Sequence, residues 1–262
     1  MELYYTIVLF IFGITLGSFY NVVGYRLPRG ESIAYPPSHC TKCGHRLTAL
    51  ELIPIFSFLF QKGKCKKCGD KISWFYSIFE FTTGILFSIS YLVFGLSLDL
   101  FIALTFISML LIVIISDYQT MIIPDELLIF TGIVLIVEIY FKGTSLLLNS
   151  LINGLIMFTI MLLMKLIADK IFGRESMGGG DIKLMFIYGL TFNALFGTNL
   201  GWTTSCMSIC LASFIGLPVS LIYLRKTKNH EIPFGPFLAI SAIILVIFKI
   251  DFNTLVNFLT VN

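Results

Sequence analysis

Long apolar stretches recur along this chain of 262 residues and limit what it can fold into. Hydrophobic residues make up 57% of the sequence and charged residues only 13%, and the mean hydropathy is +0.92. A helix that crosses a bilayer needs ~20 largely apolar residues, and the sequence supplies such a stretch repeatedly. This composition excludes a water-soluble domain and predicts an all-α polytopic membrane protein.

Eight segments fit as transmembrane helices, at about residues 3–23, 78–96, 100–116, 126–141, 146–168, 183–199, 204–224 and 236–250. Residues 1–23 lack the basic start and the small-residue cleavage site of a signal peptide, so we expect them to remain as the first transmembrane helix. The predicted organisation continues with a loop domain at 24–77, a seven-helix membrane domain at 78–250 and a short external amphipathic tail at 251–262.

Basic residues gather in three places. Of the 18 lysines and arginines, nine lie between residues 24 and 76, four surround the segment 177–183, and three lie at 225–228. Short loops rich in lysine and arginine mark the cytoplasmic side of a membrane protein. We therefore expect all three clusters inside the cell and both termini outside.

The loop domain at 24–77 carries two CxxCG knuckles, which contain the cysteines Cys40, Cys43, Cys65 and Cys68. Their spacing is typical of a structural zinc site with four cysteine ligands, and a glycine after each pair permits the tight turn that aims backbone N–H groups at sulfur. The alternatives are two disulfides, which a reducing cytosol disfavours, or four free thiols. His39 and His45 lie close enough to replace a ligand, but we expect both to be solvated.

Three glycines and an aspartate, Gly178, Gly179, Gly180 and Asp181, precede the apolar segment that begins at Lys183. A backbone without Cβ atoms can approach an extended peptide closely. An ionisable group at membrane depth is costly and indicates a functional site. Asp117, at the end of another apolar segment, is the expected partner of Asp181, because two carboxylates that share a proton can activate water against a peptide bond. We expect the three glycines and Lys183 to bind substrate.

Other interpretations stay open from the residues alone. A carboxylate at a helix boundary costs little at the water interface, so Asp117 and Asp181 also fit that passive position. An ion- or proton-coupled transporter would carry carboxylates near the middle of its spans. The carboxylates to consider within the predicted spans are Glu80 and Glu138, and both lie near span ends. A non-catalytic membrane scaffold stabilised by zinc explains the cysteines but leaves the glycines without a role. We expect no nucleic-acid partner.

Six motifs in order resemble those of the type IV prepilin leader peptidases with N-methyltransferase activity, and they cover nearly the whole chain. They are Gly17–Val22 with Arg26–Pro28, Pro36–Cys43, Glu51–Ser57 with the second knuckle, Asp117 with Ile123–Asp125, Gly178–Lys183, and Ile232–Pro236. The short loops and modest size are similar to those of the peptidases that process competence pseudopilins.

The resemblance implies a membrane-embedded aspartic endopeptidase of the GxGD type, with Asp117 and Asp181 as its dyad. It implies cleavage of prepilin or pseudopilin leaders after a glycine, at the cytoplasmic face of the bacterial plasma membrane. It also implies methylation of the new N-terminus with S-adenosylmethionine as cofactor, for which Glu80 and Gly84 are the expected binding residues. Phe75 and Ser77 depart from the arginine and proline that are common in this part of the family.

Overall fold

The computed structural model describes residues 1–173, 175, 177–197, 201–226 and 232–260. Within these residues the chain forms helices and no strands, which confirms the all-α class. The chain divides into two compact units, Met1–Gly95 and Leu96–Asn262.

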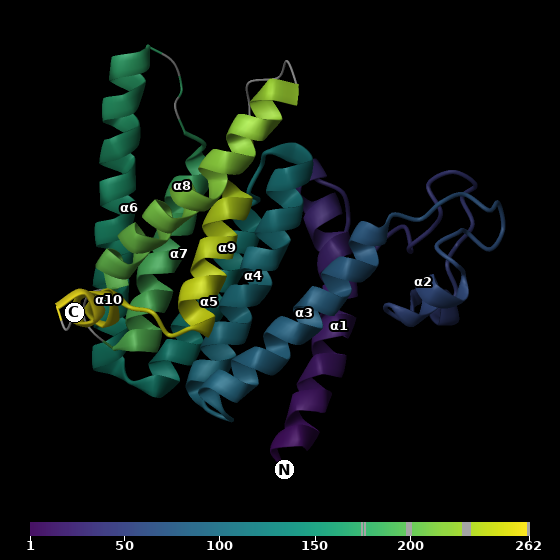
Figure 1. Cartoon of the computed structure of the whole chain (residues 1–262), viewed down its shortest axis with the longest axis horizontal. Helices are drawn as coiled ribbons and strands as arrows, with labels where there is room; N and C mark the ends of the chain where they lie inside the picture. Colours follow the sequence, from purple (N-terminus) through teal and green to yellow (C-terminus); the bar gives the residue numbers. More distant parts are fainter. Residues whose placement is uncertain (174, 176, 198–200, 227–231, 261–262) are drawn as a thin grey trace. The chain divides into compact units, whose positions relative to one another are not determined.

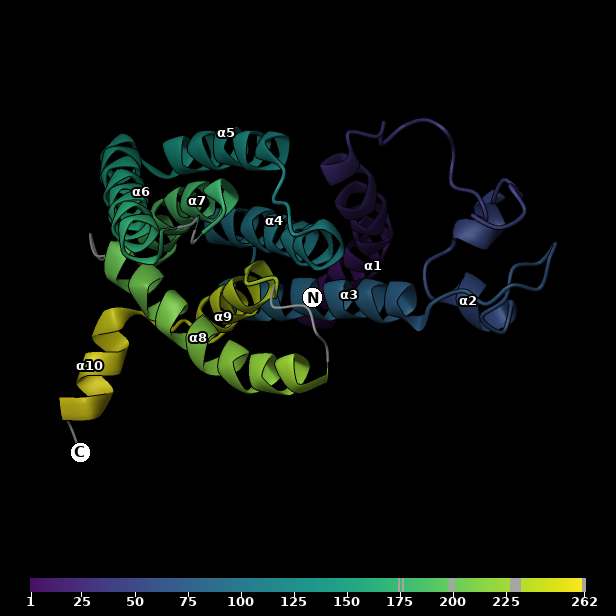
Figure 2. The same cartoon turned by 90° about the horizontal axis from the view of Figure 1, so that it is seen from above.

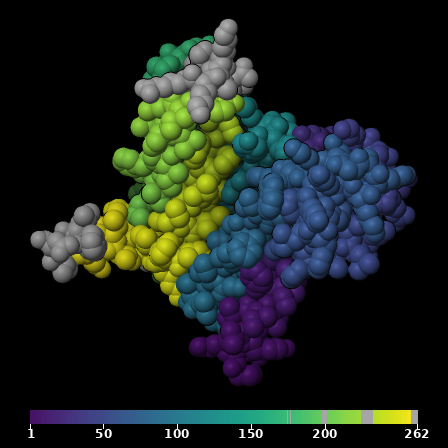
Figure 3. All heavy atoms as spheres, turned by 45° about the vertical axis from the view of Figure 1, so that its right-hand side comes forward, coloured from purple at the N-terminus to yellow at the C-terminus, as the bar shows by residue number. Residues whose placement is uncertain are grey.

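Unit 1 consists of two long helices and the loop domain that joins them. Helices α1 (Glu2–Arg26) and α3 (Trp74–Phe94) pack against each other (Figure 1). The loop contains η1 (Leu27–Arg29), η2 (Ala49–Leu52) and α2 (Phe56–Phe60), and Figure 3 shows its residues, in blue, as a compact mass of side chains. Its small apolar centre includes Phe58, which is buried and packs edge to face on Trp74 with ring centroids 4.7 Å apart.

Unit 2 is a helix bundle built around α4 (Leu98–Thr120). Its other helices are α5 (Asp125–Lys142), α6 (Thr144–Phe172), α7 (Gly179–Phe196), α8 (Gly201–Lys226), α9 (Gly235–Ile247) and α10 (Phe252–Thr260). Helix α4 packs against α5, α7 and α9 (Figures 1 and 2). The Phe106 ring on α4 meets Tyr188 and Phe192 of α7 edge to face, at 5.2 and 5.8 Å. These aromatic contacts pack the first half of α4 against the second half of α7.

Polar side chains also join the helices of unit 2. Asn153 on α6 donates to Asn193 Oδ1 on α7 at 3.2 Å, and Asn193 donates to Ser150 Oγ at 3.1 Å. Lys142 at the end of α5 pairs with Asp99 at the start of α4 at 2.5 Å. Because an unpaired polar group is costly in an apolar bundle, each of these pairs holds its helices in one register.

The positions of the predicted helices are confirmed, but the number of membrane spans is not. Helices occur at all eight predicted places, yet only five of the described helices, α1, α3, α4, α6 and α8, are long and apolar enough to cross a membrane. Helix α9 has only 13 residues, and the 18-residue helix α5 carries Asp125, Glu126, Glu138 and Lys142. The chain is therefore a multi-pass membrane protein, but the predicted number of eight spans is not supported. In the tail, the amphipathic helix α10 is present (Figure 2).

The third basic cluster, at 225–228, and His230 lie outside the residues whose side chains the structure describes.

Candidate functional site

The four cysteines of the loop domain come together in unit 1. Their Sγ atoms all lie within 4.8 Å of one another, with Cys40 and Cys68 separated by 3.8 Å and Cys43 and Cys65 by 3.9 Å. A tetrahedral zinc with Zn–S bonds of ~2.3 Å holds its sulfur ligands ~3.8 Å apart. The cysteines are not joined as disulfides, so the cluster fits the predicted zinc site.

The two knuckles have the same backbone design. Gly44 and Gly69 adopt positive φ angles of 67° and 73°, a conformation that favours glycine. Their N–H groups donate to the carbonyl oxygens of Cys40 and Cys65, at 2.9 and 2.8 Å. In the first knuckle, the N–H groups of Cys43 and Lys42 point at the Cys40 sulfur and lower the pKa of its thiol. A thiol of lowered pKa is readily available as the thiolate that binds a metal.

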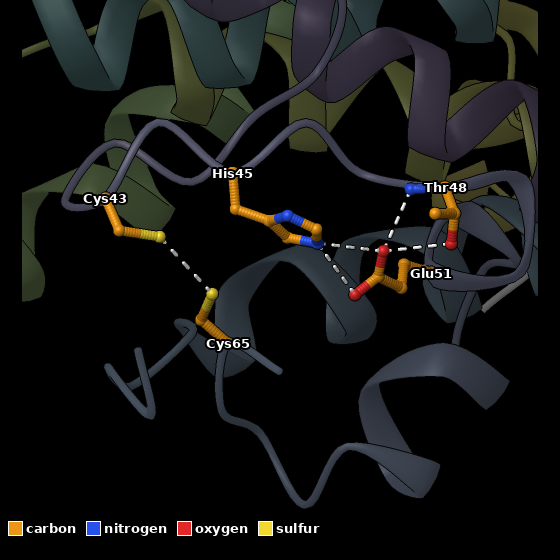
Figure 4. Close-up of polar contacts among 5 residues, drawn as sticks. All are labelled: Cys43, His45, Thr48, Glu51 and Cys65. Carbon is orange, nitrogen blue, oxygen red and sulfur yellow. Dashed lines mark hydrogen bonds and ion pairs between the residues drawn. The ribbon is translucent and has the colours of Figure 1, made fainter. Parts of the chain in front are cut away.

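His45 forms a hydrogen bond within the loop domain and is not part of the cysteine cluster. Figure 4 shows its ring turned toward Glu51, with Nε2 at 3.2 Å from the nearer carboxylate oxygen. The backbone N–H and the hydroxyl of Thr48 both donate to the same carboxylate at 2.9 Å; together with His45 they lower the pKa of Glu51. His45 was expected to be solvated; its ring is partly exposed, and the bond to Glu51 holds it in place. His39 is exposed, as expected.

Asp117 lies in the last turn of α4, which runs on to Thr120. The residue is only 6% exposed, and its Oδ2 atom accepts a hydrogen bond of 2.8 Å from the backbone N–H of Gly235. The carboxylate is therefore held inside unit 2 by the start of α9, rather than lying free at a helix boundary.

Asp181 is the third residue of α7, whose N-cap is Gly178. Negative charge is favoured at this end of a helix by the unpaired N–H groups and the helix dipole. Asp181 interacts electrostatically with Asp117. The structure thus brings the two predicted catalytic carboxylates together, one from the end of α4 and one from the start of α7.

The glycines beside Asp181 differ in their surroundings. A Cβ atom on Gly180 would lie 2.9 Å from Cβ of Ile123, so this glycine lets α7 begin tightly against the segment before α5. A Cβ atom on Gly179 would meet no atom within 4 Å, and one on Gly178 would lie 3.6 Å from Oδ2 of Asp181. The backbone at Gly178 and Gly179 is therefore the open side of the stretch.

Lys183 reaches across to the start of α5. Its Nζ lies 2.6 and 2.7 Å from the two carboxylate oxygens of Asp125, and both side chains are about half exposed. Asp125 is the first residue of α5 but does not cap it, because the N-cap is Pro124 and no side chain caps this helix. The carboxylate instead forms the ion pair with Lys183. The sequence does not reveal this pair, because the two residues are 58 positions apart.

Gly235 is a site residue that carried no predicted role. It is buried, and a Cβ atom on it would lie 2.7 Å from Oδ2 of Asp117. The segment Ile232–Pro236 did stand out as a motif, and Pro236 lies in the first turn of α9, where proline is common. Because only glycine leaves room for the carboxylate, the residue type at 235 is fixed by Asp117.

Glu80, the predicted cofactor residue of α3, lines a cavity of about 720 Å³ within unit 1. It is 7% exposed, and its Oε2 accepts a hydrogen bond of 2.8 Å from the N–H of Ile55. Gly84 lies one turn further along and does not line the cavity. A Cβ atom there would lie 2.6 Å from Ile14 and 2.9 Å from Phe10, so Gly84 allows α1 and α3 to pack closely.

Comparison with known proteins assigns each unit to a family model. The model described as "Bacterial Peptidase A24 N-terminal domain" matches residues 11–94, and the "Type IV leader peptidase family" model matches residues 104–221. These ranges fall within unit 1 and unit 2 respectively.

Several curated proteins are similar along most of their length. A prepilin leader peptidase/N-methyltransferase of Bacillus subtilis (strain 168) is 38% identical over 92% of this chain and 93% of its own. Proteins of the same name from Pseudomonas putida and Dichelobacter nodosus are 29% and 32% identical, over 90% and 88% of this chain and 88% and 87% of their own. No solved structure matches significantly.

We expect one zinc ion per chain in purified, reduced protein, measured by elemental analysis. Replacement of Cys43 by serine is expected to release the metal and to expose the loop domain to proteolysis, because a closed site of protein ligands contributes its binding energy to folding. Cys206→Ser, on α8 and outside the cluster, is the matched control and should retain zinc. Metal-free wild-type protein with an intact loop domain would contradict the assignment.

Proposed function

This chain belongs to the prepilin leader peptidase/N-methyltransferase family, and from that premise we propose that it is a membrane-embedded aspartic endopeptidase. It removes the leader of prepilin-like proteins, including pseudopilins, and then methylates the new N-terminus. One observation carries the peptidase proposal, namely that the buried Asp117 carboxylate at the end of α4 faces the charge of Asp181 at the start of α7, where Gly180 lies against Ile123 just beyond α4.

The chemistry of such a pair follows from the repulsion between its charges. Two nearby carboxylates cannot easily both ionise, so they share one proton. The ionised carboxylate accepts a proton from water as the water oxygen attacks the peptide carbonyl carbon, and the protonated carboxyl stabilises the carbonyl oxygen. A proton then passes to the amine nitrogen as the C–N bond breaks. The N–H of Gly235 fixes which oxygen of Asp117 remains free for water.

The open backbone at Gly178 and Gly179 supports a role in holding the substrate. An extended peptide can lie against a backbone that has no side chains and hydrogen-bond to it. Lys183, two residues beyond Asp181, is paired with the half-exposed Asp125. An exposed ion pair is worth only ~0–1 kcal/mol, so a polar group of the substrate can replace Asp125 as the partner of Lys183.

Methylation requires a second site, which we assign to unit 1 with Glu80. When bound, S-adenosylmethionine supplies an electrophilic methyl group for the amine that cleavage exposes. The name of these relatives joins both activities, and a cleaved product that is one methyl group heavier tests the second. A peptidase without methylation would leave product of unmodified mass.

The sidedness of the protein follows from its basic loops. We place the loop domain at 24–77, the segment at 169–182 and the segment at 225–235 on the cytoplasmic side of the bacterial plasma membrane, because lysine and arginine concentrate in these loops. This arrangement puts Asp117, Asp181 and the cysteine cluster on the cytoplasmic face.

Replacement of either catalytic aspartate should abolish cleavage. Asp117→Asn and Asp181→Asn keep the shape but remove the proton acceptor, so we expect at least a ~10²–10⁴-fold loss of cleavage rate. The double variant should be hardly slower than either single one, because the two groups serve one step. Cleavage of a co-expressed pilin-like protein, followed by its change in mass, measures the effect.

Asp99→Asn is the matched control for the dyad, because it lies on the same helix as Asp117 and pairs with Lys142. It should cleave at close to the wild-type rate. If Asp125→Asn is inactive while Asp117→Asn still cleaves, the dyad is wrongly assigned.

Gly235→Ala should slow cleavage by about 100-fold, because its Cβ atom, 2.7 Å from Oδ2, must displace the Asp117 carboxylate, and a shift of ~1 Å in a reacting group costs about that much. Gly132→Ala in α5 is the control, since its Cβ atom would meet only the flexible end of Ile187 at 3.3 Å. Equal rates for the two variants, with equal amounts of inserted protein, would remove Gly235 from the site.

Single cysteines introduced at Thr41 and Glu175 test the topology. In a background without the exposed Cys210, both positions should resist a membrane-impermeant thiol reagent in intact cells and react after the membrane is opened. Labelling of either position from outside would overturn the assigned orientation.

A further inference from the structure

The segment 50–60 of the loop domain exposes several large apolar side chains. Six of them, which we call the apolar patch, are between 41% and 83% exposed: Leu50, Leu52, Ile53, Phe56, Leu59 and Phe60. Phe58, on the short helix α2 of the same segment, is buried and packs against the rest of unit 1. A group of exposed apolar side chains on an otherwise polar loop indicates a binding surface.

Contacts with α3 fix where the apolar patch lies. Phe58 packs on the ring of Trp74, the first residue of α3, with ring centroids 4.7 Å apart. The N–H of Ile55 donates to Oε2 of Glu80 at 2.8 Å, and Glu80 lies ~9 Å further along the helix, at a rise of ~1.5 Å per residue. Figures 1 and 2 both show α2 near the start of α3. The patch is thus held beside the first two turns of this helix.

The start of α3 lies at the boundary between lipid and water. The helix is apolar enough to cross a bilayer, and its 21 residues give a length of ~31 Å, which matches the ~30 Å thickness of the hydrocarbon core. Its first residue, Trp74, therefore lies at the edge of the core. The Trp74 side chain is exposed, and tryptophan is enriched at this interface. The apolar patch, which lies beside the same turns, is at the same depth.

Exposed lysines follow the apolar patch in the sequence and add positive charge to this region. They are Lys62, Lys64, Lys66, Lys67 and Lys71. Within the described part of the chain none of these five forms an ion pair, whereas Glu51 accepts from Thr48, and Asp70 pairs with Lys42. Lysines near a membrane attract anionic lipid headgroups, and their apolar stems can lie along the boundary. The charge of this region therefore complements an anionic lipid surface.

We propose that the apolar patch inserts into the headgroup layer of the membrane, while the lysines at 62–71 bind the phosphates of anionic lipids. The bilayer already surrounds α3, on whose first residue α2 packs, so the patch continues a surface that is in contact with lipid. An apolar segment of a substrate would also cover the patch, but it would leave the lysines without partners. The loop domain is then anchored to the membrane at a third point, in addition to α1 and α3.

A fluorescent label on the apolar patch tests this contact. Full-length, zinc-loaded protein with Phe60→Cys, in a background of Cys206→Ser and Cys210→Ser, is labelled and placed in phosphatidylcholine nanodiscs that contain about 30% of the anionic lipid phosphatidylglycerol. An apolar face at the interface lies ~5–10 Å deep, so lipids with a spin label near the top of the acyl chain should quench this label at least about threefold more than one at Thr41→Cys, in the first knuckle. Leu59→Cys provides a second position on the patch and should respond as Phe60→Cys does.

Nanodiscs of phosphatidylcholine alone should reduce the quenching at Phe60→Cys by at least about twofold, because the lysines lose their anionic partners; unchanged quenching would overturn their role. The zinc content of each labelled sample reports whether its loop domain is folded. Equal quenching on the patch and at Thr41→Cys would overturn the proposal. A label that is shielded from water but not quenched by lipid would overturn it too, because protein would then cover the patch. Shielding that appears only with a pilin-like substrate would instead assign the patch to that substrate.

Discussion

The burial of the Asp117 carboxylate is the constraint on which the architecture of unit 2 depends. Removing such a group from water costs several kcal/mol unless hydrogen bonds replace its hydration. The N–H of Gly235 supplies one, at 2.8 Å, and thereby fixes the start of α9 against the end of α4. Asp181 enters from the first turn of α7, where backbone N–H groups favour negative charge. The hydrogen bonding and charge of two carboxylates thus fix the end of α4 and the starts of α7 and α9.

Unit 1 is stabilised in a different way, because its loop domain has too little apolar surface to fold by burial alone. Phe58 and Trp74 form a small contact, and the capping network of Thr48, His45 and Glu51 orders one short segment. The four cysteines join the two knuckles over a separation of 28 residues between Cys40 and Cys68. A bound zinc ion would turn this cross-link into the main source of folding energy for the loop domain.

The sequence predicted those features that leave a local pattern. Apolar runs located the helices, and the CxxCG spacing located the cysteine cluster with its glycine turns. The pairing of Asp117 with Asp181 was also expected, from two carboxylates at the ends of apolar segments. The bond from Gly235 to Asp117 was not, because it joins residues 118 positions apart and a backbone donor has no sequence signature.

The division into two compact units has a consequence for how such a protein can diverge. Each family model falls within one unit, and in our assignment each unit carries one complete chemistry. Substitutions that accumulate around the cavity of unit 1 can erode methyl transfer without touching any residue assigned to peptide cleavage. Descendants of one ancestral gene can therefore lose one activity and retain the other. Phe75 and Ser77, where the resemblance to the family departs from its common residues, both lie in unit 1.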